Sequence, residues 1–271
     1  MNLHGVDIQV EGNGTETLVM LHGWPDTLAL WNDTVEALSD THQCVRFTLP
    51  AFDAQAPVQA KSLVEMVNFI HEVVSAVSPH KPVTLVLHDW GCIFGYEYAA
   101  LHPDRVKRMV AVDVGDHNSH ALLSSWTAKA KWGVFSYQIW LAVAWQIARW
   151  FKSPGKSVAN RMTRYMAKAL RCPSPLADMH SGMNSPYAMK WMGSLGGFDK
   201  AANVLKQLPS ARPMLYVYGR RKPFMFHSPE WLAKIADHPG SRVEEFDTGH
   251  WVMSAKPEQF AALLQEWLAA T

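Results

Sequence analysis

Residues 85–95 read LVLHDWGCIFG, and this stretch decides the fold class. An apolar run typical of a buried strand stops at Asp89, and a helix-like segment rich in small and aromatic residues follows at once. A strand that enters a helix through a tight turn pushes the turn side chain above the sheet, as in a nucleophile elbow. Gly91 and Cys92 supply small residues for the turn, whereas Leu87 stands where a small residue is usual. The stretch therefore predicts an α/β fold with Asp89 at the carboxyl edge of its sheet.

The rest of the chain repeats this strand-to-helix alternation. Apolar runs predict strands at residues 6–10, 17–23, 44–49, 83–89, 106–114, 214–219 and 242–247. Helical patterns lie at residues 26–39, 61–77, 91–102, 229–237 and 256–269. Continuous Val/Leu runs that alternate with helices are typical of a mostly parallel sheet covered by helices on both faces.

The alternation breaks once, between residues 117 and 200. This part is rich in Trp, Met and Ala and shows no convincing strand pattern. We therefore expect a core domain of residues 1–116 and 201–271, with residues 117–200 as a helical cap insert laid over it.

Composition excludes several classes of protein. The chain has 271 residues, of which 48% are aliphatic or aromatic, so it is long enough to bury a sizeable core. Its 25 Lys and Arg nearly balance 24 Asp and Glu, whereas proteins that bind nucleic acid or anionic membranes carry a basic excess. The most apolar helical run, residues 134–151, is interrupted by polar residues, so we expect no membrane span and no membrane partner. Its apolar content leaves a homodimer contact open.

The cysteines and the N-terminus predict a cytoplasmic protein. Cys44, Cys92 and Cys172 are far apart and lack metal-ligand spacing, which is typical of reduced thiols. The first residues, MNLHGVDIQVEG, have neither the basic start nor the apolar stretch of a secretory signal.

Polar residues follow the predicted strands at the points where they end. Because the carboxyl ends of parallel strands meet at one edge of a sheet, Asp89, Asp113 and His250 should converge there. A carboxylate, a second carboxylate and a histidine suit the roles of nucleophile, orienting acid and general base. The alternative interpretation of Asp89 is an ordinary helix N-cap, a position that Asp favours.

The segments that follow three of the predicted strands resemble those of a known family. HGWPD at 22–26, HDWG at 88–91 and TGHW at 248–251 resemble the epoxide hydrolase and haloalkane dehalogenase branch of the α/β-hydrolase fold, which uses an aspartate nucleophile. The resemblance covers nearly the whole chain in the expected order. It implies that Asp89 forms an alkyl ester with the substrate and that His250 activates the water that hydrolyses it. It also implies an oxyanion hole made by the backbone N–H groups of Trp24 and Trp90, with no metal or organic cofactor.

The orienting acid departs from the family pattern. Most relatives carry it in a loop that reads roughly G-x-x-D after the strand equivalent to 214–218, but this chain has Gly219-Arg220-Arg221-Lys222-Pro223 there. Without an orienting acid the imidazole would lose control of its tautomer and stabilisation of its charge. We expect Asp113 to supply the acid, as in some dehalogenases of the superfamily, with Asp116 as the second candidate. Asp116 alternatively reads as a turn residue.

Tyrosines of the insert bear on the reaction, because an epoxide oxygen needs a proton as it leaves. VFSYQIW at 134–140 and NSPY at 184–187 resemble the segments that carry the acid tyrosines of epoxide hydrolases, which implies Tyr137 and Tyr187. Tyr165 is the competing candidate. A phenol is neutral at pH 7 and donates well, although tyrosines at helical spacing are more often packing residues.

The preferred hypothesis is hydrolysis of a small hydrophobic epoxide. A haloalkane dehalogenase would use the same nucleophile and needs N–H donors around a halide; Trp90 fits, but Trp24 replaces the usual Asn. A cofactor-free dioxygenase of a hydroxyquinolone would use a His–Asp pair like His250 and Asp113, although such proteins usually carry Ser at the elbow. A binding module without catalysis is the fourth alternative.

Overall fold

The computed structural model describes residues 1–54, 58, 61–117, 119–191 and 212–271. Its described strands form one sheet in the order β1-β2-β4-β3-β5-β6-β7-β8, in which the β1–β2 and β2–β4 pairs are antiparallel and the others parallel. The strands are β1 (Asn2–Leu3), β2 (Val6–Glu11), β3 (Thr17–Leu21), β4 (Gln43–Phe47), β5 (Val83–His88), β6 (Val106–Val112), β7 (Met214–Gly219) and β8 (Arg242–Phe246). All seven predicted strands are confirmed, and the two-residue β1 is too short to show a pattern.

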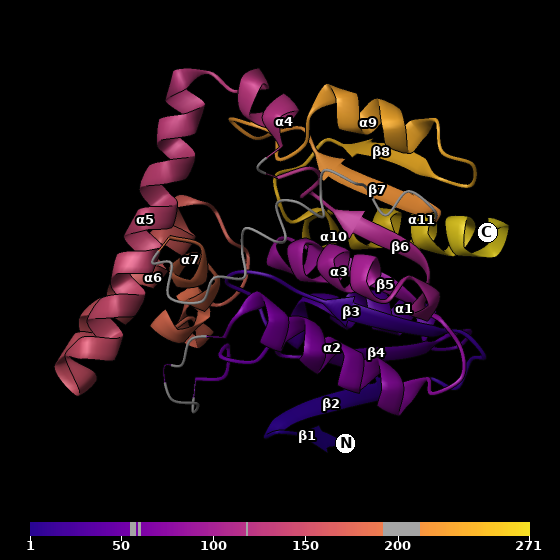
Figure 1. Cartoon of the computed structure of the whole chain (residues 1–271), viewed down its shortest axis with the longest axis horizontal. Coiled ribbons are helices and arrows are strands. Elements are labelled where there is room, and N and C mark those ends of the chain that lie inside the picture. Colours follow the sequence, from indigo (N-terminus) through magenta and orange to yellow (C-terminus); the bar gives the residue numbers. More distant parts are fainter. Residues whose placement is uncertain (55–57, 59–60, 118, 192–211) are drawn as a thin grey trace.

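Helices cover both faces of the sheet, as Figure 1 shows. One face packs against α2 (Leu63–Val77), α3 (Trp90–Leu101) and α9 (Pro229–Ala236), and the other against α1 (Asn32–Leu38), α10 (Val252–Ala255) and α11 (Pro257–Ala270). Successive strand residues alternate between the two cores: Val19 and Leu21 face the first, Leu18 and Met20 the second. Because both faces are buried, the strands read as continuous apolar runs.

Between β6 and β7 the chain leaves the sheet. The described part of this insert holds α4 (His120–Ser125), α5 (Ala128–Trp150), α6 (Lys152–Ala169) and α7 (Ser185–Trp191), with short 3-10 helices at Leu176–Asp178 and Ser181–Asn184. The strands point toward these helices (Figure 1). The expected boundary between residues 200 and 201 lies outside the described residues, so the domain limits stay a prediction. None of the described helices, α5 included, combines the length and apolar character that crossing a bilayer requires.

The turn between β5 and α3 has the geometry of an elbow. Asp89 adopts φ +53° and ψ −121°, and α3 begins at the next residue. A side chain at residue 91 would collide with the backbone carbonyl of Leu21, so the close approach of α3 to β3 requires Gly91. Leu87 fits because its side chain packs onto Gly95, one turn into α3, where a Cβ would collide with both Leu87 methyl groups. Leu87 thus stands where a small residue is usual before the turn, and Gly95 in α3 supplies the space that its side chain needs.

This pairing predicts strong coupling between Leu87 and Gly95. Gly95→Ala should destabilise the protein by about 1–3 kcal/mol through overpacking, and Leu87→Ala by about 2–5 kcal/mol through the cavity it leaves. The double variant should lose less than the sum, because the added methyl group occupies the vacated space. Urea unfolding measures all three. Gly133→Ala is the matched control, since a Cβ there meets only Phe224 at 3.9 Å; additive effects at 87 and 95 would contradict the pairing.

Candidate active site

Three predicted residues meet above the carboxyl edge of the sheet. Asp89 follows β5, Asp113 follows β6 and His250 follows β8. The Nδ1 atom of His250 is hydrogen-bonded to Oδ2 of Asp113, and its Nε2 atom lies 3.3 Å from Oδ2 of Asp89. One imidazole therefore bridges two carboxylates that are distant in sequence.

Both carboxylates sit on backbone in the left-handed region. Asp89 has φ +53° and Asp113 has φ +72°. A non-glycine residue in such a conformation costs on the order of 1–3 kcal/mol and persists only where its surroundings hold it, most often at functional sites. The loops after β5 and β6 are thus strained where they present these two acids.

The HGWPD motif, residues 22–26, supplies a backbone donor to Asp89. The N–H of Trp24 donates to Oδ1 of Asp89 at 2.8 Å. A Cβ at Gly23 would collide with the same oxygen, so this approach requires glycine, and the backbone nitrogen of Trp90 lies on the same side, 2.6 Å from that imagined Cβ. The two backbone N–H groups expected to form an oxyanion hole therefore lie beside the predicted nucleophile. Oδ1 faces Trp24, and Oδ2 faces His250.

The loop after β6 separates the two candidate acids. Asp113 is fully buried and contacts His250, and its Oδ1 also accepts from the backbone N–H of Gly219 at 3.0 Å. Asp116 instead accepts from the backbone and hydroxyl of Ser228, at 2.7 and 2.6 Å, and from Ser119. Asp116 thus fastens the loop to the start of α9, and the geometry favours Asp113 as the orienting acid.

The three cations after β7 do not behave alike. Lys222, only 7% exposed, forms an ion pair with Oδ1 of Asp113. Arg220 and Arg221 are exposed and pair with Asp247. The loop in which the family resemblance places the acid therefore contacts Asp113, the predicted acid of this chain, through Lys222. Sequence reasoning noticed these cations but missed this contact.

Asp26, the last residue of the HGWPD motif, is a second buried acid that sequence reasoning left without a role. It accepts from the indole of Trp251 at 2.9 Å and from the hydroxyl of Ser174, in the insert, at 2.5 Å. Burial raises the pKa of Asp26 to about 6, although both hydrogen bonds act in the opposite direction. Asp26 therefore links Trp251, the residue after His250, to Ser174 of the insert.

The three site residues shift one another's pKa values. Burial alone would lower the pKa of His250, but Asp113 and Asp89 outweigh it and raise that pKa to about 9. Burial alone would raise the pKa of Asp89 and of Asp113, but His250 holds the first below its usual range, and Lys222 and His250 hold the second there. Two carboxylates and an imidazolium are therefore the resting state at neutral pH.

This arrangement predicts the titration of His250. We expect its imidazole to titrate near pH 9 in the resting protein, and at a lower pH in Asp89→Asn, because one of the two flanking anions is lost. Since the folded-state pKa is raised, the stability that the cation contributes is present below ~6.5 and is lost as pH rises through about 9. NMR of the ring Hε1 proton measures the midpoint. Asp33→Asn, at an exposed carboxylate, is the control, and an unchanged midpoint in Asp89→Asn would contradict the arrangement.

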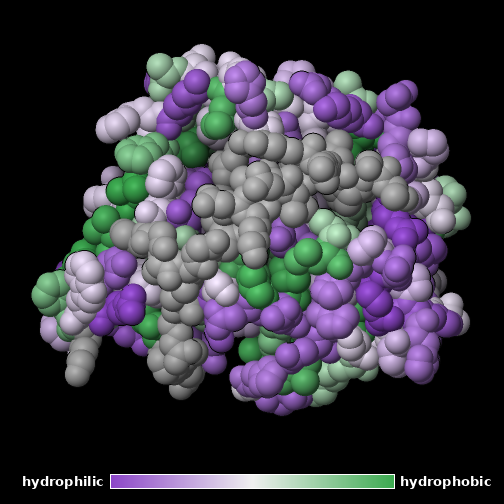
Figure 2. All heavy atoms as spheres, viewed as in Figure 1, coloured by the Kyte–Doolittle hydropathy of each residue, from purple (hydrophilic) through white to green (hydrophobic). Residues whose placement is uncertain are grey.

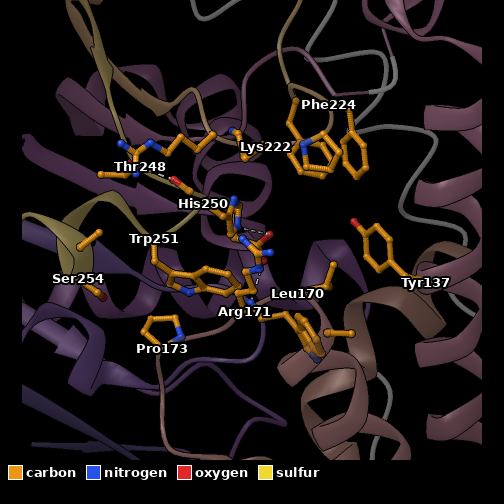
Figure 3. A pocket seen from close by; sticks show the side chains of 18 of the residues that line it. Tyr137, Leu170, Arg171, Pro173, Lys222, Phe224, Thr248, His250, Trp251 and Ser254 are labelled. Carbon is orange, nitrogen blue, oxygen red and sulfur yellow. Dashed lines mark hydrogen bonds and ion pairs between the residues drawn. The ribbon is translucent and has the colours of Figure 1, made fainter.

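A cavity of about 930 Å³ opens beside the three residues. Asp89, His250, Trp24, Tyr137 and Tyr187 are among its lining residues. In Figure 3 the phenol of Tyr137 points from the insert toward His250. A smaller cavity of about 340 Å³ shares Asp89 and both tyrosines with the first.

The tyrosines differ in their surroundings. The ring of Tyr187 contacts those of Trp24, Trp90 and Tyr137, with centroids 5.3 to 6.0 Å apart. Tyr165 lies on the outer surface against Trp140 and lines neither cavity. The structure thus brings Tyr137 and Tyr187 to Asp89 and leaves Tyr165 outside.

The chain resembles known proteins along almost its whole length. The family model described as alpha/beta hydrolase fold matches residues 16–257. A cis-3-alkyl-4-alkyloxetan-2-one decarboxylase from Shewanella oneidensis is 34% identical, over 96% of this chain and 84% of its own. A protein of the same name from Xanthomonas campestris is 30% identical, over 93% of this chain and 88% of its own.

Solved structures share the fold at lower identity. An epoxide hydrolase from Bacillus megaterium in complex with an inhibitor superposes with a TM-score of 0.70 at 20% identity, covering 99% of both chains. A haloalkane dehalogenase variant from Bradyrhizobium elkanii gives 0.69 at 15% identity, covering 100% of this chain and 95% of the other. At such identities the likeness establishes the fold and leaves the reaction to the site.

Proposed function

The chain belongs to the α/β-hydrolase fold family, and we propose that this hydrolase opens an epoxide to a diol through an ester on Asp89. The observation that carries the proposal is that Tyr137 and Tyr187 line the same cavity as Asp89. An alkoxide is a poor leaving group, so opening the ring needs a proton donor opposite the nucleophile. Burial raises the pKa of both phenols above the usual range, which keeps them protonated.

The first step uses both oxygens of Asp89. Oδ2, the oxygen near His250, attacks a ring carbon while the C–O bond breaks and a tyrosine gives its proton to the leaving oxygen. Oδ1 then becomes the carbonyl oxygen of the ester, and it already accepts from the Trp24 N–H at 2.8 Å. The donor therefore stands where negative charge returns when the ester is hydrolysed.

Ester formation also prepares the base. His250 is cationic in the resting protein, which does not hinder attack by the Asp89 carboxylate. Once Asp89 is esterified its negative charge is gone, so the pKa of His250 falls, and the proton of its imidazolium passes through active-site water to the tyrosinate that ring opening left behind. The imidazole is then neutral and can act as the base. The neutral imidazole takes a proton from water while the water oxygen bonds to the ester carbonyl carbon. The remaining proton of that hydroxyl leaves with the diol, so Asp89 is again a carboxylate, His250 an imidazolium and the tyrosine a neutral phenol. The sum is epoxide plus water to diol.

The tyrosines provide the test. Tyr137→Phe and Tyr187→Phe should each lower kcat/KM for styrene oxide by about 10²–10⁴, the usual range for loss of a general acid. Tyr165→Phe is the matched control and should leave the rate unchanged, because Tyr165 is exposed and outside both cavities. Diol formation is followed by chromatography. Wild-type rates in both cavity variants would refute the role of the phenols.

A second candidate is the opening of an oxetan-2-one, favoured by the two decarboxylases that align over more than nine-tenths of this chain. This four-membered lactone is also a strained ring with a C–O bond that Asp89 could break by attack on the ring carbon. The leaving group is then a carboxylate, which needs no proton; loss of CO₂ from it and release of Asp89 would give an alkene. The tyrosine variants should spare this reaction and slow epoxide opening.

The site supports the dehalogenase and dioxygenase alternatives less well than it supports ring opening. The indole N–H of Trp24, at the position where dehalogenases carry an Asn donor, donates to Asn184 at 2.8 Å. The elbow residue, Asp89, stands where the dioxygenases usually carry Ser.

A further inference from the structure

The outer surface of the insert is rich in exposed aromatic side chains. Trp132 is 69% exposed, Trp150 68% and Tyr165 64%. In the described part of the chain, every large aromatic residue that is strongly exposed belongs to residues 117–191. An aromatic surface of this extent marks a contact with another molecule or phase.

Many of these side chains share the outward side of α5 and the adjacent side of α6, a surface that we call the α5–α6 face. On α5 it comprises Trp132, Phe135, Trp140, Val143 and Trp150, whose spacing places them on one side of the helix. The opposite side of α5 is buried, through residues such as Leu141 and Trp145. Figure 2 shows apolar side chains gathered along the edge where Figure 1 places α5.

The adjacent helix α6 extends the face and adds positive charge. The ring of Trp140 lies 5.9 Å from that of Tyr165, and its indole donates to the carbonyl of Met162 at 3.1 Å. Arg161 and Lys168 flank Tyr165 at helical spacing and are exposed. Aromatic and basic side chains are therefore interleaved on one surface.

The insert carries a large net positive charge. Residues 117–191 hold ten Lys and Arg but a single acid, Asp178, a net charge of +9 in a chain whose total is +1. The balanced composition thus conceals a basic insert on an acidic remainder.

We propose that the α5–α6 face docks on the surface of an anionic lipid bilayer. Trp and Tyr favour the interface between headgroups and acyl chains. A helix with an apolar face flanked by Lys and Arg lies in that plane, and anionic lipids attract its charges. A symmetric dimer is the competing use of the face, but it would set the same basic patch of each copy against the other. The sequence expectation of no membrane partner rested on net charge and on spanning length, neither of which describes a local surface.

The face leads to the active-site cavity. The end of α6 and the residues after it, Ala169, Leu170 and Arg171, are part of the cavity lining. An apolar substrate dissolved in the bilayer would therefore enter the cavity from the end of α6. This route holds for an epoxide and for an oxetan-2-one alike, so the docking does not depend on which ring is opened.

Co-sedimentation of the full chain with vesicles tests the proposal. We expect binding to phosphatidylglycerol vesicles, weakening as salt is added, and little binding to phosphatidylcholine alone. Each basic residue near an anionic surface contributes a factor of about five, so Arg161→Glu with Lys168→Glu should weaken binding at least about 25-fold. The matched control, Lys81→Glu with Lys234→Glu, makes the same change of charge on exposed lysines of the core and should bind like the wild type.

Insertion of the aromatic side chains has its own readout. Acyl-chain bromine should quench wild-type tryptophan fluorescence, and Trp132→Ser with Trp150→Ser should lose most of that quenching while keeping the thermal melting profile. Failure of the wild type to bind phosphatidylglycerol vesicles, or equal losses in the two charge-reversed proteins, would overturn the proposal. So would a dimer in analytical ultracentrifugation that the tryptophan variants dissociate, which would assign the face to contact between copies. If the tryptophan variants unfold, the charge-reversed pair still decides.

Discussion

His250→Gln should accumulate an ester on Asp89 when it is incubated with styrene oxide. Attack by Asp89 does not require a neutral His250, because the carboxylate is ionised and Trp24 already donates to its Oδ1. Hydrolysis does require a base for the attacking water, so the variant should stop at the ester. Intact-mass spectrometry should show the protein heavier by the whole mass of the epoxide, and peptide mapping should place the addition on Asp89. Turnover should fall by about 10⁴–10⁶.

Controls separate this outcome from unspecific alkylation. Asp89→Asn should show neither adduct nor turnover, and His238→Gln, a histidine change away from the site, should behave like the wild type. With 1-bromobutane, a butyl adduct and bromide release would instead establish dehalogenation. An adduct that persists in Asp89→Asn would move the reaction to another nucleophile. Continued turnover in His250→Gln would remove the histidine from the mechanism.

Asp113→Asn should lose both rate and stability. The rate should fall by about 10⁴, as expected when a histidine loses the carboxylate that sets its tautomer and stabilises its charge. Stability should fall by about 3–5 kcal/mol, because Lys222 would be left buried beside a neutral partner. Stopped-flow hydrolysis and denaturant unfolding measure the two losses separately.

A second substitution distinguishes the two losses. Asp113→Asn combined with Lys222→Gln removes both charges, so it should regain part of the stability while the rate stays low. Recovery of the rate together with stability would show that Asp113 is structural. Asp116→Asn is the matched change in the same loop: it should cost stability, because Asp116 accepts three hydrogen bonds, but leave the titration of His250 in place. A larger loss of rate in Asp116→Asn than in Asp113→Asn would reverse the assignment of the acid.

In the insert, sequence patterns do not predict which side chains face the cavity and which face outward. Tyr137 and Tyr165 both occur at helical spacing in Trp- and Met-rich segments, and only the packing of α5 and α6 turns the first into the cavity and the second outward. The same holds for the exposed tryptophans, since an apolar helix face reads alike whether it meets a core or a bilayer. Helix periodicity specifies which residues share a face, but it does not specify what that face contacts.

The sequence by itself determined the α/β fold and the edge at which Asp89, Asp113 and His250 meet. It could do so because alternation of buried strands and helices implies a parallel sheet, and parallel strands end at one edge. Only the tertiary structure separated Asp113 from Asp116, which lie three residues apart after the same strand. The left-handed backbone at Asp113 and the contacts of its carboxylate with Gly219 and Lys222 set the direction of that side chain. The contact with Ser228, before α9, sets the direction of Asp116. These contacts join segments more than 100 residues apart, and no local pattern encodes which of two neighbouring carboxylates they hold.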